Sequence, residues 1–516
     1  MAKAIISLLI GCTIFLLPIN GQNYNEKYRL QVHYSVPSGW MNDPNGLIYE
    51  DGYYHLFYQY NPASTTFGPP HWGHAQSLDL VHWENLPIAI YPYNEQWIFS
   101  GCCVLDKDNV TGFGSHLPGQ SEQPLIAIYT LHEQHGETHK ETQGLSYSLD
   151  KGMTWTYYDA NPIIPSLGIP DFRDPNVFER NGTFYMVLAE FDRIEFFKSK
   201  NLINWEPISK FGVDPMEGSK DGVWECPSLF SLKDEQNNEH DVLVVSENIP
   251  NSAIEYFIGK FDGVKFNTYN KSRSLRLDFG HDNFAAVPYV NDPFGRIIMV
   301  SWMSNWNYSL DTPTSTWRGQ MTIPRELKLK TVDGSLYLVQ RLVDDLYSLI
   351  DGSRQWSLST PYHLLGNQNI NLSSLMPFKT GSMLILEYAI NIENIRNGEI
   401  GIKFGNNLGE SVLFHYNVSS DTYVFDRRKS GNVTFNTKFA DQIAKAKRIS
   451  TSKCLSGQIL LDTASIEVFA DDGLSVFTSL FFPTEPYENI ELIFDTADKS
   501  ATVEKLSVSA LHSIWT

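Results

Sequence analysis

The pattern of apolar and polar positions along the chain is typical of β-strands. Short alternating runs recur throughout, separated by turn-forming residues, and no long stretch shows the period of about 3.6 residues that marks an amphipathic helix. The clearest alternation lies toward the C-terminus, at residues 384–395, 411–418, 459–470 and 475–482. The sequence therefore predicts an all-β protein.

Two diverged repeats indicate which β architecture the first part of the chain adopts. Residues 49–60 and 178–191 each place an Asp-Gly or Asn-Gly turn between β-rich arms, which is a strong hairpin signal. A second pattern, Ser followed by Asp or Asn and then Trp, occurs in SLDLVHW, SLDKGMTW and SKNLINW. Repeated hairpins with one aromatic residue per unit predict a β-propeller of roughly five blades over residues 23–335. An array of β-sandwiches is a less favoured alternative, because sandwiches rarely repeat such a unit.

The character of the chain changes after the predicted propeller. Residues 336–354 have a mixed apolar pattern, which predicts a short helix or a linker. The alternating runs that follow, separated by turns such as ADDG at 470–473, predict a β-sandwich over residues 355–516. Two domains also agree with the length of 516 residues, which is long for a single hydrophobic core.

The N-terminus resembles a secretory signal peptide over residues 1–22. Lys3 provides a short positive region, residues 5–17 are mostly apolar, and residues 18–22 are turn-rich. As an alternative, LIGC at residues 9–12 resembles a lipoprotein cleavage site, at which Cys12 would carry the lipid. The apolar run continues past Cys12, which favours secretion without a lipid anchor. No second long apolar run occurs, so the sequence predicts a mature chain without a membrane span.

Charge and cysteine content narrow the range of partners. The formal net charge is −20, which disfavours binding to nucleic acid and anionic lipid and leaves a neutral substrate unaffected. The five cysteines include no CxxC pair, so a structural zinc site is not expected. Aromatic residues make up 13% of the chain, and their flat rings suit both β-structure and stacking on sugar rings.

Three acidic motifs carry the candidate chemistry: Asn42-Asp43-Pro44-Asn45-Gly46, Phe172-Arg173-Asp174-Pro175 and Trp224-Glu225-Cys226-Pro227. Each is weak alone, but together they supply the two carboxyl groups that glycoside hydrolysis needs on either side of the scissile bond. An apolar neighbourhood favours a protonated Glu225, while amide donors favour an ionised Asp43. Arg173 is expected to keep the adjacent Asp174 charged, as an acceptor for sugar hydroxyls.

These motifs, in this order, resemble the β-fructofuranosidases of glycoside hydrolase family 32, which include invertases, inulinases and levanases. Further matching segments extend over nearly the whole chain and include FYQYNP, HWGHAQS, FSG, DFGHDNFAA, WMSNW, WRGQMTIPRE, FDRRKSGN and IEVFADDG. The resemblance implies a five-bladed propeller followed by a β-sandwich, in agreement with the prediction from the repeats.

The resemblance also implies a role for each acidic residue. Asp43 would be the nucleophile that forms a fructosyl-enzyme ester, Glu225 the acid/base, and Asp174 the residue that stabilises the transition state through fructose hydroxyls. Arg173 would hold the acidic cluster. No metal or organic cofactor is implied. Asn42 and Gln59 would hydrogen-bond the fructosyl unit, and Phe99 and Ser100 would line the same subsite. Trp72 and Trp306 would offer it apolar walls.

Two positions depart from the family pattern. Phe67-Gly68 stands where the family often carries Trp-Gly, so Phe67 would present a smaller ring to the fructose subsite. Cys102 and Cys103 follow the FSG segment, where small residues are usual. Either change could tune specificity, and neither removes a catalytic carboxylate.

The sequence leaves several alternatives open. Sucrose, inulin and levan all present the same terminal fructosyl unit, and exo cleavage is favoured over endo cleavage only weakly. A fructosyltransferase would use the same residues. A sugar-binding propeller that has lost its chemistry is disfavoured, because all three carboxylates are present. An inverting relative is disfavoured by the WMNDPNG match. The oligomeric state is not determined by the sequence.

Overall fold

The computed structural model describes residues 24–114, 123–136, 138–248, 252–270, 275–496 and 500–515. The expected signal peptide, with Cys12, lies outside these ranges. The described chain is almost entirely β-structure, with only short 3₁₀ turns, so the predicted all-β class is confirmed. In the described part of the chain, no helix has the length and apolar character needed to cross a membrane.

Within the described residues, the N-terminal part forms five sheets, each built on four antiparallel strands in chain order, and two of the sheets have a fifth short strand. The first two sheets contain β1 (Gly39–Glu50), β2 (Tyr53–Asn61), β3 (His71–Ser77) and β4 (Trp83–Ile90), then β5 (Trp97–Leu105), β6 (Leu125–His135), β7 (Thr138–Ser148) and β8 (Thr156–Tyr157). The third sheet contains β9 (Phe172–Arg180), β10 (Thr183–Glu190), β11 (Arg193–Ser199) and β12 (Glu206–Phe211).

The fourth sheet contains β13 (Val223–Lys233), β14 (Glu239–Asn248), β15 (Ala253–Phe261) and β16 (Phe266–Thr268), with β17 (Leu275–Arg276) beside β15. The fifth contains β18 (Phe284–Pro288), β19 (Ile298–Trp302), β21 (Arg325–Val332) and β22 (Ser335–Leu342). Between β19 and β21 lie the turn η1 (Ser309–Asp311) and β20 (Trp317–Arg318), which pairs in parallel with β1.

The five sheets close into a ring around their first strands. β1 contacts β5, β5 contacts β9, β9 contacts β13, β13 contacts β18, and β18 returns to β1. This closure makes the sheets the blades of a propeller and places the start of every first strand around one axis. The prediction of a five-bladed propeller is therefore confirmed.

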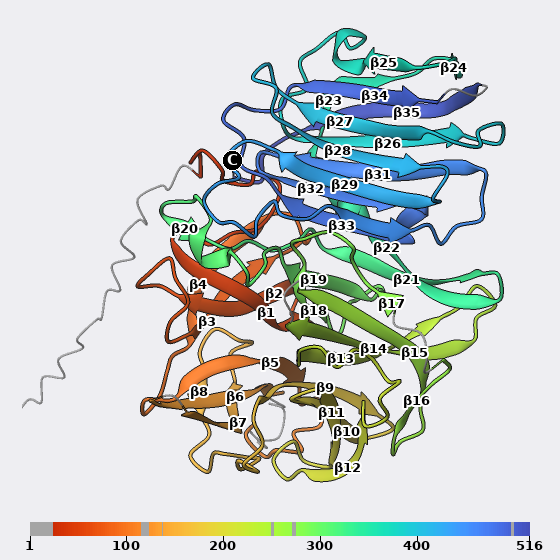
Figure 1. The fold of residues 1–516 in the computed structure, drawn as a ribbon. Helices are drawn as coiled ribbons and strands as arrows, with labels where there is room; N and C mark the ends of the chain where they lie inside the picture. The colour runs from red at the N-terminus through yellow and green to blue at the C-terminus, as the bar shows by residue number, and fades with distance from the viewer. Residues whose placement is uncertain are drawn as a thin grey trace, which may run out of the picture.

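The C-terminal part is a β-sandwich, as predicted, and lies above the blades in Figure 1. One sheet contains β23 (Ile350–Ser357), β35 (Ala501–Leu511), β26 (Leu384–Asn391), β31 (Cys454–Asp462), β32 (Ser465–Ala470), β33 (Ser475–Leu480) and β24 (Tyr362–Leu364). The other contains β25 (Gln368–Asn371), β34 (Asn489–Asp495), β27 (Glu399–Gly405), β28 (Ser411–Asn417), β29 (Thr422–Lys429) and β30 (Ala444–Lys447). Short turns η3 (Leu372–Ser374) and η4 (Asp471–Gly473) complete this domain.

The expected linker at 336–354 is wrong in its extent. β22 pairs with β21 along its whole length and completes the fifth blade, while β23 pairs with β35 inside the sandwich. The connection between the domains is the short turn η2 (Asp344–Leu349). The mixed apolar pattern at the start of this segment belongs to the strand β22, whose successive side chains face opposite sides of the blade.

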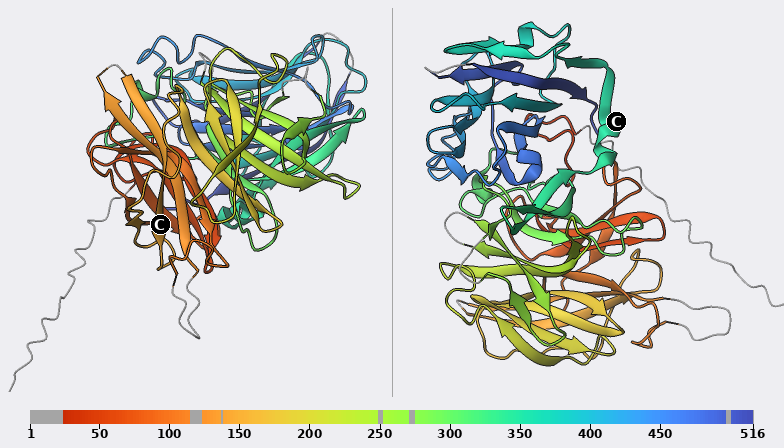
Figure 2. Two further views of the ribbon diagram at one scale, coloured as in Figure 1. Left: turned by 90° about the horizontal axis from the view of Figure 1, so that it is seen from below. Right: turned by 90° about the vertical axis from the view of Figure 1, so that its right-hand side faces the viewer.

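The two domains share a buried, charged interface, and the right-hand view in Figure 2 shows the teal-to-blue sandwich above the red-to-green propeller. Arg325 of the propeller donates to Glu467 of the sandwich at 2.6 Å and to Asp278 at 3.1 Å. His33 lies between Asp462 and Glu467, at 2.7 and 3.0 Å. Burial lowers the pKa of His33, but its hydrogen bonds to these two carboxylates raise it to about 9.

Replacing Glu467 tests how strongly this interface holds the protein together. Glu467→Gln keeps the size of the side chain but leaves the buried charges of Arg325 and His33 without their shared partner. We expect a loss of about 3–5 kcal/mol in the free energy of unfolding, the usual cost of breaking a buried ion pair. Urea-induced unfolding at neutral pH measures this loss.

The matched control is Glu488→Gln, which removes an exposed partner of Lys379 at 3.5 Å. Its effect should stay within about 0.5 kcal/mol, because exposed ion pairs contribute little. Equal unfolding midpoints for the two variants would contradict the assignment of the interface charges as a stabilising unit.

Candidate active site

The three acidic motifs lie at the starts of β1, β9 and β13, the first strands of three blades, and there the pairing with the second strand is interrupted. The register shifts between Met41 and Pro44 in β1, and between Glu225 and Ser228 in β13. In β9 the interruption falls between Arg173 and Asn176, which pair with Ala189 and Val187 of β10. Each interruption contains or borders a proline, which has no N–H to donate to the ladder, and such bulges re-aim side chains.

Two residues in these bulges have left-handed backbone conformations. Asp174 has φ of 65° and Cys226 has φ of 48°, although neither is glycine. Such conformations cost free energy and persist where the surrounding structure imposes them, often at functional sites. Here they turn the chain so that Asp43, Asp174 and Glu225 converge, with 8%, 5% and 9% of each residue exposed to solvent.

Hydrogen bonds fix the orientation of Asp43. The Ser100 hydroxyl donates to Oδ2 at 2.8 Å, and the Asn42 amide donates to Oδ1 at 3.1 Å. Asn42 is in turn held by the indole N–H of Trp40, which donates to its Oδ1 at 2.7 Å. The expected residues Asn42 and Ser100 are thus placed directly on the carboxylate, and Trp40 is a support that the sequence did not suggest.

No ion pair between Arg173 and Asp174 occurs among the described residues, and Arg173 acts on its neighbour through its charge, which lowers the pKa of Asp174 without outweighing burial. Its guanidinium donates to Glu225 Oε1 at 2.7 Å, to Glu141 at 3.4 Å, and to Asp171. Residues next to each other on a strand point to opposite faces, so sequence adjacency separates rather than joins these two side chains.

The electrostatics of the carboxyl groups follow from this arrangement. Burial, followed by the charges of Glu225 and Asp43, raises the pKa of Asp174 to about 8, against the lowering effect of Arg173. Burial also raises the pKa of Glu225, while the charge and hydrogen bond of Arg173 lower it. The net result is a raised pKa for Glu225, which agrees with the expectation that this carboxyl group holds a proton.

Cys226 lies between two of the carboxylates, a position that sequence reasoning missed. Its Sγ is 3.6 Å from Oδ2 of Asp43 and 3.6 Å from Oδ2 of Asp174, and its backbone N–H donates to Asp174 at 3.0 Å. Burial and the neighbouring negative charges raise the pKa of the thiol well above its ordinary value, so it remains an S–H donor. Only its place between Glu225 and Pro227 in the motif could have drawn attention to it.

Aromatic side chains gather beside the carboxylates. Phe67 packs edge-on against Trp306 and Phe99, with ring centroids 5.7 and 6.2 Å apart. Trp306 also packs on Trp40 at 6.0 Å. These contacts bring the expected residues Phe67, Phe99 and Trp306 together, and a cluster of aromatic rings beside acidic groups suits a sugar ring.

Two further expected substrate-binding residues, Trp72 and Gln59, donate hydrogen bonds to the start of β5. Trp72 is fully buried and its indole N–H donates to the carbonyl of Phe99 at 3.0 Å, so it cannot wall the substrate as predicted. Gln59 is 2% exposed, and its amide nitrogen donates to the carbonyl of Ile98 at 3.0 Å. Both side chains therefore fix the start of β5, which carries Phe99 and Ser100.

A ring of blades with three converging carboxyl groups and an aromatic border defines a carbohydrate-cleaving propeller. Comparison with known families gives the particular class. The N-terminal domain of glycosyl hydrolases family 32 matches residues 33–340, and the C-terminal domain of that family matches residues 349–510. The chain therefore belongs to glycosyl hydrolase family 32.

Individual relatives match over nearly the whole chain. A levanase of Bacillus subtilis is 37% identical and covers 100% of this chain and 76% of its own length. An extracellular exo-inulinase of Aspergillus ficuum is 33% identical, covering 96% of each chain. Among solved structures, an exo-inulinase of Aspergillus awamori superposes with a TM-score of 0.86 at 30% identity, covering 95% of this chain and 100% of its own.

Proposed function

We propose that the protein is a retaining β-fructofuranosidase that cleaves the β-D-fructofuranosyl linkages of fructans, such as levan or inulin, and of sucrose. The observation that carries this proposal is the convergence of Asp43, Asp174 and Glu225 from three different blades. Membership of family 32 and the similarity to a levanase and an exo-inulinase support the substrate class.

In the first half-reaction, the Asp43 carboxylate attacks C2 of the fructosyl unit. The bond from C2 to the leaving oxygen breaks, Glu225 donates a proton to that oxygen, and a fructosyl ester remains on Asp43. Glu225 then removes a proton from water, whose oxygen attacks C2 and releases fructose and the free Asp43 carboxylate. Asp174 binds hydroxyls of the fructosyl unit throughout.

We infer that cleavage is of the exo type. The aromatic border of Phe67, Phe99 and Trp306 suits a single terminal sugar ring, and the exo-inulinase relative matches 96% of this chain. Endo cleavage and fructosyl transfer would use the same three carboxyl groups, so they differ only in products. A binding protein without activity is disfavoured because all three groups are in place.

We also propose that the protein is exported, with residues 1–22 removed as a signal peptide. The apolar N-terminal segment and the extracellular exo-inulinase relatives support this. The intact mass of the protein recovered outside the cytoplasm checks it: a chain that begins after residue 22 is expected, and a chain that begins at a lipidated Cys12 would instead establish lipid anchoring.

The products formed from sucrose, inulin and levan test the proposed function. Purified protein is incubated with each substrate and the products are resolved by chromatography over time, with Asp43→Asn as the control. We expect free fructose as the early product from each polymer and no turnover by Asp43→Asn, which keeps the size and turn preference of the residue.

Other outcomes would replace the proposal. Early oligofructosides would mean endo cleavage, and longer oligosaccharides formed from sucrose would mean fructosyl transfer. Absence of any product would favour a binding protein. Activity of Asp43→Asn equal to that of the natural enzyme would refute the role of Asp43 as nucleophile.

Replacing Arg173 tests the role of Glu225 as the acid. Arg173 lowers the pKa of Glu225, so Arg173→Gln should raise that pKa. The acid acts when protonated, and activity falls as pH rises through its pKa, so the alkaline limb of the kcat/KM profile should move to higher pH. Arg173→Lys retains a positive charge and should leave that limb nearer its original position. A limb that moves to lower pH in Arg173→Gln would contradict the assignment.

A further inference from the structure

Two pairs of buried polar residues form a ladder on the second blade. β6 and β7 pair so that Thr130 lies opposite Gln143 and His132 lies opposite Glu141. Alternate residues of a strand point to the same side, so the two pairs share one face of the blade. No more than 5% of any of these four residues is exposed. Buried polar side chains need partners, and the partners of this polar ladder indicate its role.

The first pair of the polar ladder holds the backbone of the third blade on both sides of Arg173. The Gln143 amide donates to the carbonyl of Phe172 at 2.9 Å, and the backbone N–H of Asp174 donates to the Thr130 hydroxyl at 2.9 Å. This is the point at which the pairing of β9 with β10 is interrupted. The second blade therefore supplies the hydrogen bonds that the third blade lacks there.

In the second pair, Glu141 binds the same guanidinium as the acid Glu225. Arg173 donates to Glu141 at 3.4 Å through one nitrogen and to Glu225 at 2.7 Å through the other. Burial raises the pKa of Glu141, but the hydrogen bond of His132 and the charge of Arg173 lower it below its ordinary value. Its Oε2 is buried and has no hydrogen-bond partner among the described residues. An ionised carboxylate in such a place is costly, which points to a use for its charge.

His132 joins Glu141 to a wall of the fructosyl subsite. Its Nδ1 is 3.3 Å from Glu141, and its Nε2 is 3.0 Å from Oε1 of Gln134. The Gln134 amide nitrogen donates to the carbonyl of Gly136 at 2.7 Å, which leaves the amide oxygen for the ring. Both ring nitrogens thus face acceptors, and a doubly protonated ring satisfies both. The face of the ring stacks on Phe99, with centroids 4.3 Å apart.

We propose that Glu141 and His132 are positioning residues of the hydrolysis. Glu141 binds one side of the Arg173 guanidinium and so limits its pull on the proton of Glu225. His132 orients Glu141 and supports the ring of Phe99. The inference rests on the proposed function and deepens it, because it names two residues that act on the acid and on the subsite wall through their neighbours.

Charged and titratable groups face the two carboxyl groups from several strands. Among the described residues, those around Glu225 are Arg173 and Asp174 of β9, Asp43 of β1 and Cys226 of β13. Those around Glu141 are His132 of β6, His139 of β7 at 3.8 Å, and Arg173, which also binds Asp171. Arg173 faces both carboxyl groups, so a change of charge at Glu141 reaches Glu225 through it.

Glu141→Gln tests this coupling, because it keeps the size of the side chain and removes the charge. The loss of a like charge and the stronger pull of Arg173 both lower the pKa of Glu225. The acid acts when protonated, so the alkaline limb of the kcat/KM profile on sucrose should move to lower pH by about half to one unit. This direction is opposite to that expected for Arg173→Gln. Glu141→Asp retains the charge and should keep the limb near its natural position.

The matched control is Glu133→Gln in the same hairpin. Glu133 accepts from Gln96 at 2.7 Å and makes no contact with Arg173 among the described residues. The alkaline limb of this variant should stay in place. A limb that moves as far in Glu133→Gln as in Glu141→Gln would show a general effect of surface charge and would contradict the proposal.

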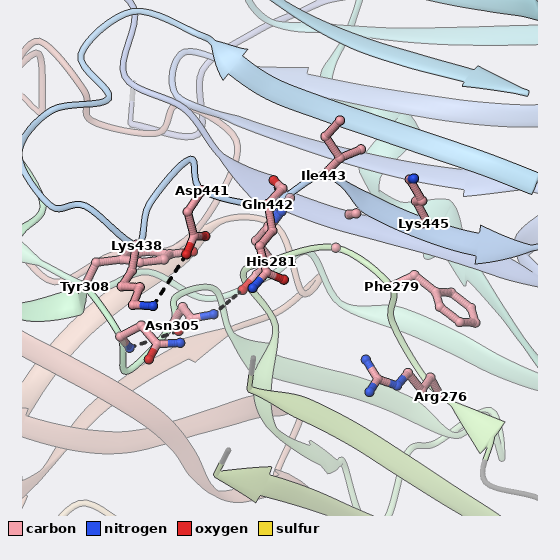
Figure 3. Close-up of a pocket in the computed structure, with 13 residues that line it drawn as sticks. Arg276, Phe279, His281, Asn305, Tyr308, Lys438, Asp441, Gln442, Ile443 and Lys445 are labelled. Carbon is pink, nitrogen blue, oxygen red and sulfur yellow. Dashed lines mark hydrogen bonds and ion pairs between the residues drawn. The ribbon is translucent and has the colours of Figure 1, made fainter. Parts of the chain in front are cut away.

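The polar ladder lies apart from the pocket in Figure 3. That pocket is lined by residues 276–281 and 305–308 on one side and by residues 438–445 on the other, and it contains no member of the ladder. Variants of the ladder therefore leave its lining unchanged, so their effects on sucrose hydrolysis report on the second blade.

Replacing His132 tests the same pair from its other side, which keeps the proposal testable if Glu141→Gln does not fold. His132→Ala removes the ring that supports Phe99 and should raise KM for sucrose roughly two- to tenfold. His132→Phe keeps a stacked ring and should retain a KM near that of the natural enzyme. Steady-state kinetics at the pH of maximum activity measures both.

The opposite results would overturn the proposal. A limb of Glu141→Gln that stays in place or moves to higher pH would refute the role of Glu141. An unchanged KM in His132→Ala, or the same rise in His132→Phe, would refute the role of His132. Failure of the proposed function is distinguishable, since the natural enzyme would then release no fructose from any substrate.

Discussion

Three carboxyl groups that repel one another have to share a nearly dry space at the centre of the blades, and much of the structure follows from that constraint. Arg173 supplies the positive charge, yet it reaches Glu225 and not its neighbour Asp174. Neutral hydrogen-bond donors stabilise the negative charge of Asp43 and Asp174. These donors are chiefly the hydroxyl of Ser100 and the thiol and backbone N–H of Cys226. Neutral donors stabilise negative charge without adding a second cation, whose charge would further lower the pKa of the acid Glu225.

The scaffold provides these donors by departing from regular β-structure at one level of the ring. Where β1, β9 and β13 begin, the ladders are interrupted next to prolines, and two residues adopt left-handed backbone conformations. Such a local cost persists because the surrounding blade imposes it: the second strands β2, β10 and β14 are paired along both edges. Among the non-glycine residues of β1, β9 and β13, left-handed conformations occur at Asp174 and Cys226 alone, beside the side chains that converge.

Sequence patterns predicted the parts of this structure that are local. Turn-flanked hairpins and alternating runs gave the propeller and the sandwich, and the three motifs located the carboxyl groups. The partners of Arg173 were not predictable, because Glu225 is 52 residues away in the chain. Burial was also hidden, because the sequence does not show that Trp72 is fully buried and bonded to the carbonyl of Phe99, whereas Trp306 packs beside Phe67.

The charged contacts between the domains have a consequence for how this enzyme can be altered. Arg325 and His33 belong to the propeller, but their compensating carboxylates, Glu467 and Asp462, are carried by the sandwich. Cutting the chain after the fifth blade would leave Arg325 without Glu467, and it would remove both carboxylates that keep His33 protonated. The propeller therefore depends on the sandwich for its stability. If the sandwich is exchanged for that of a relative, the four residues of this interface have to be kept together.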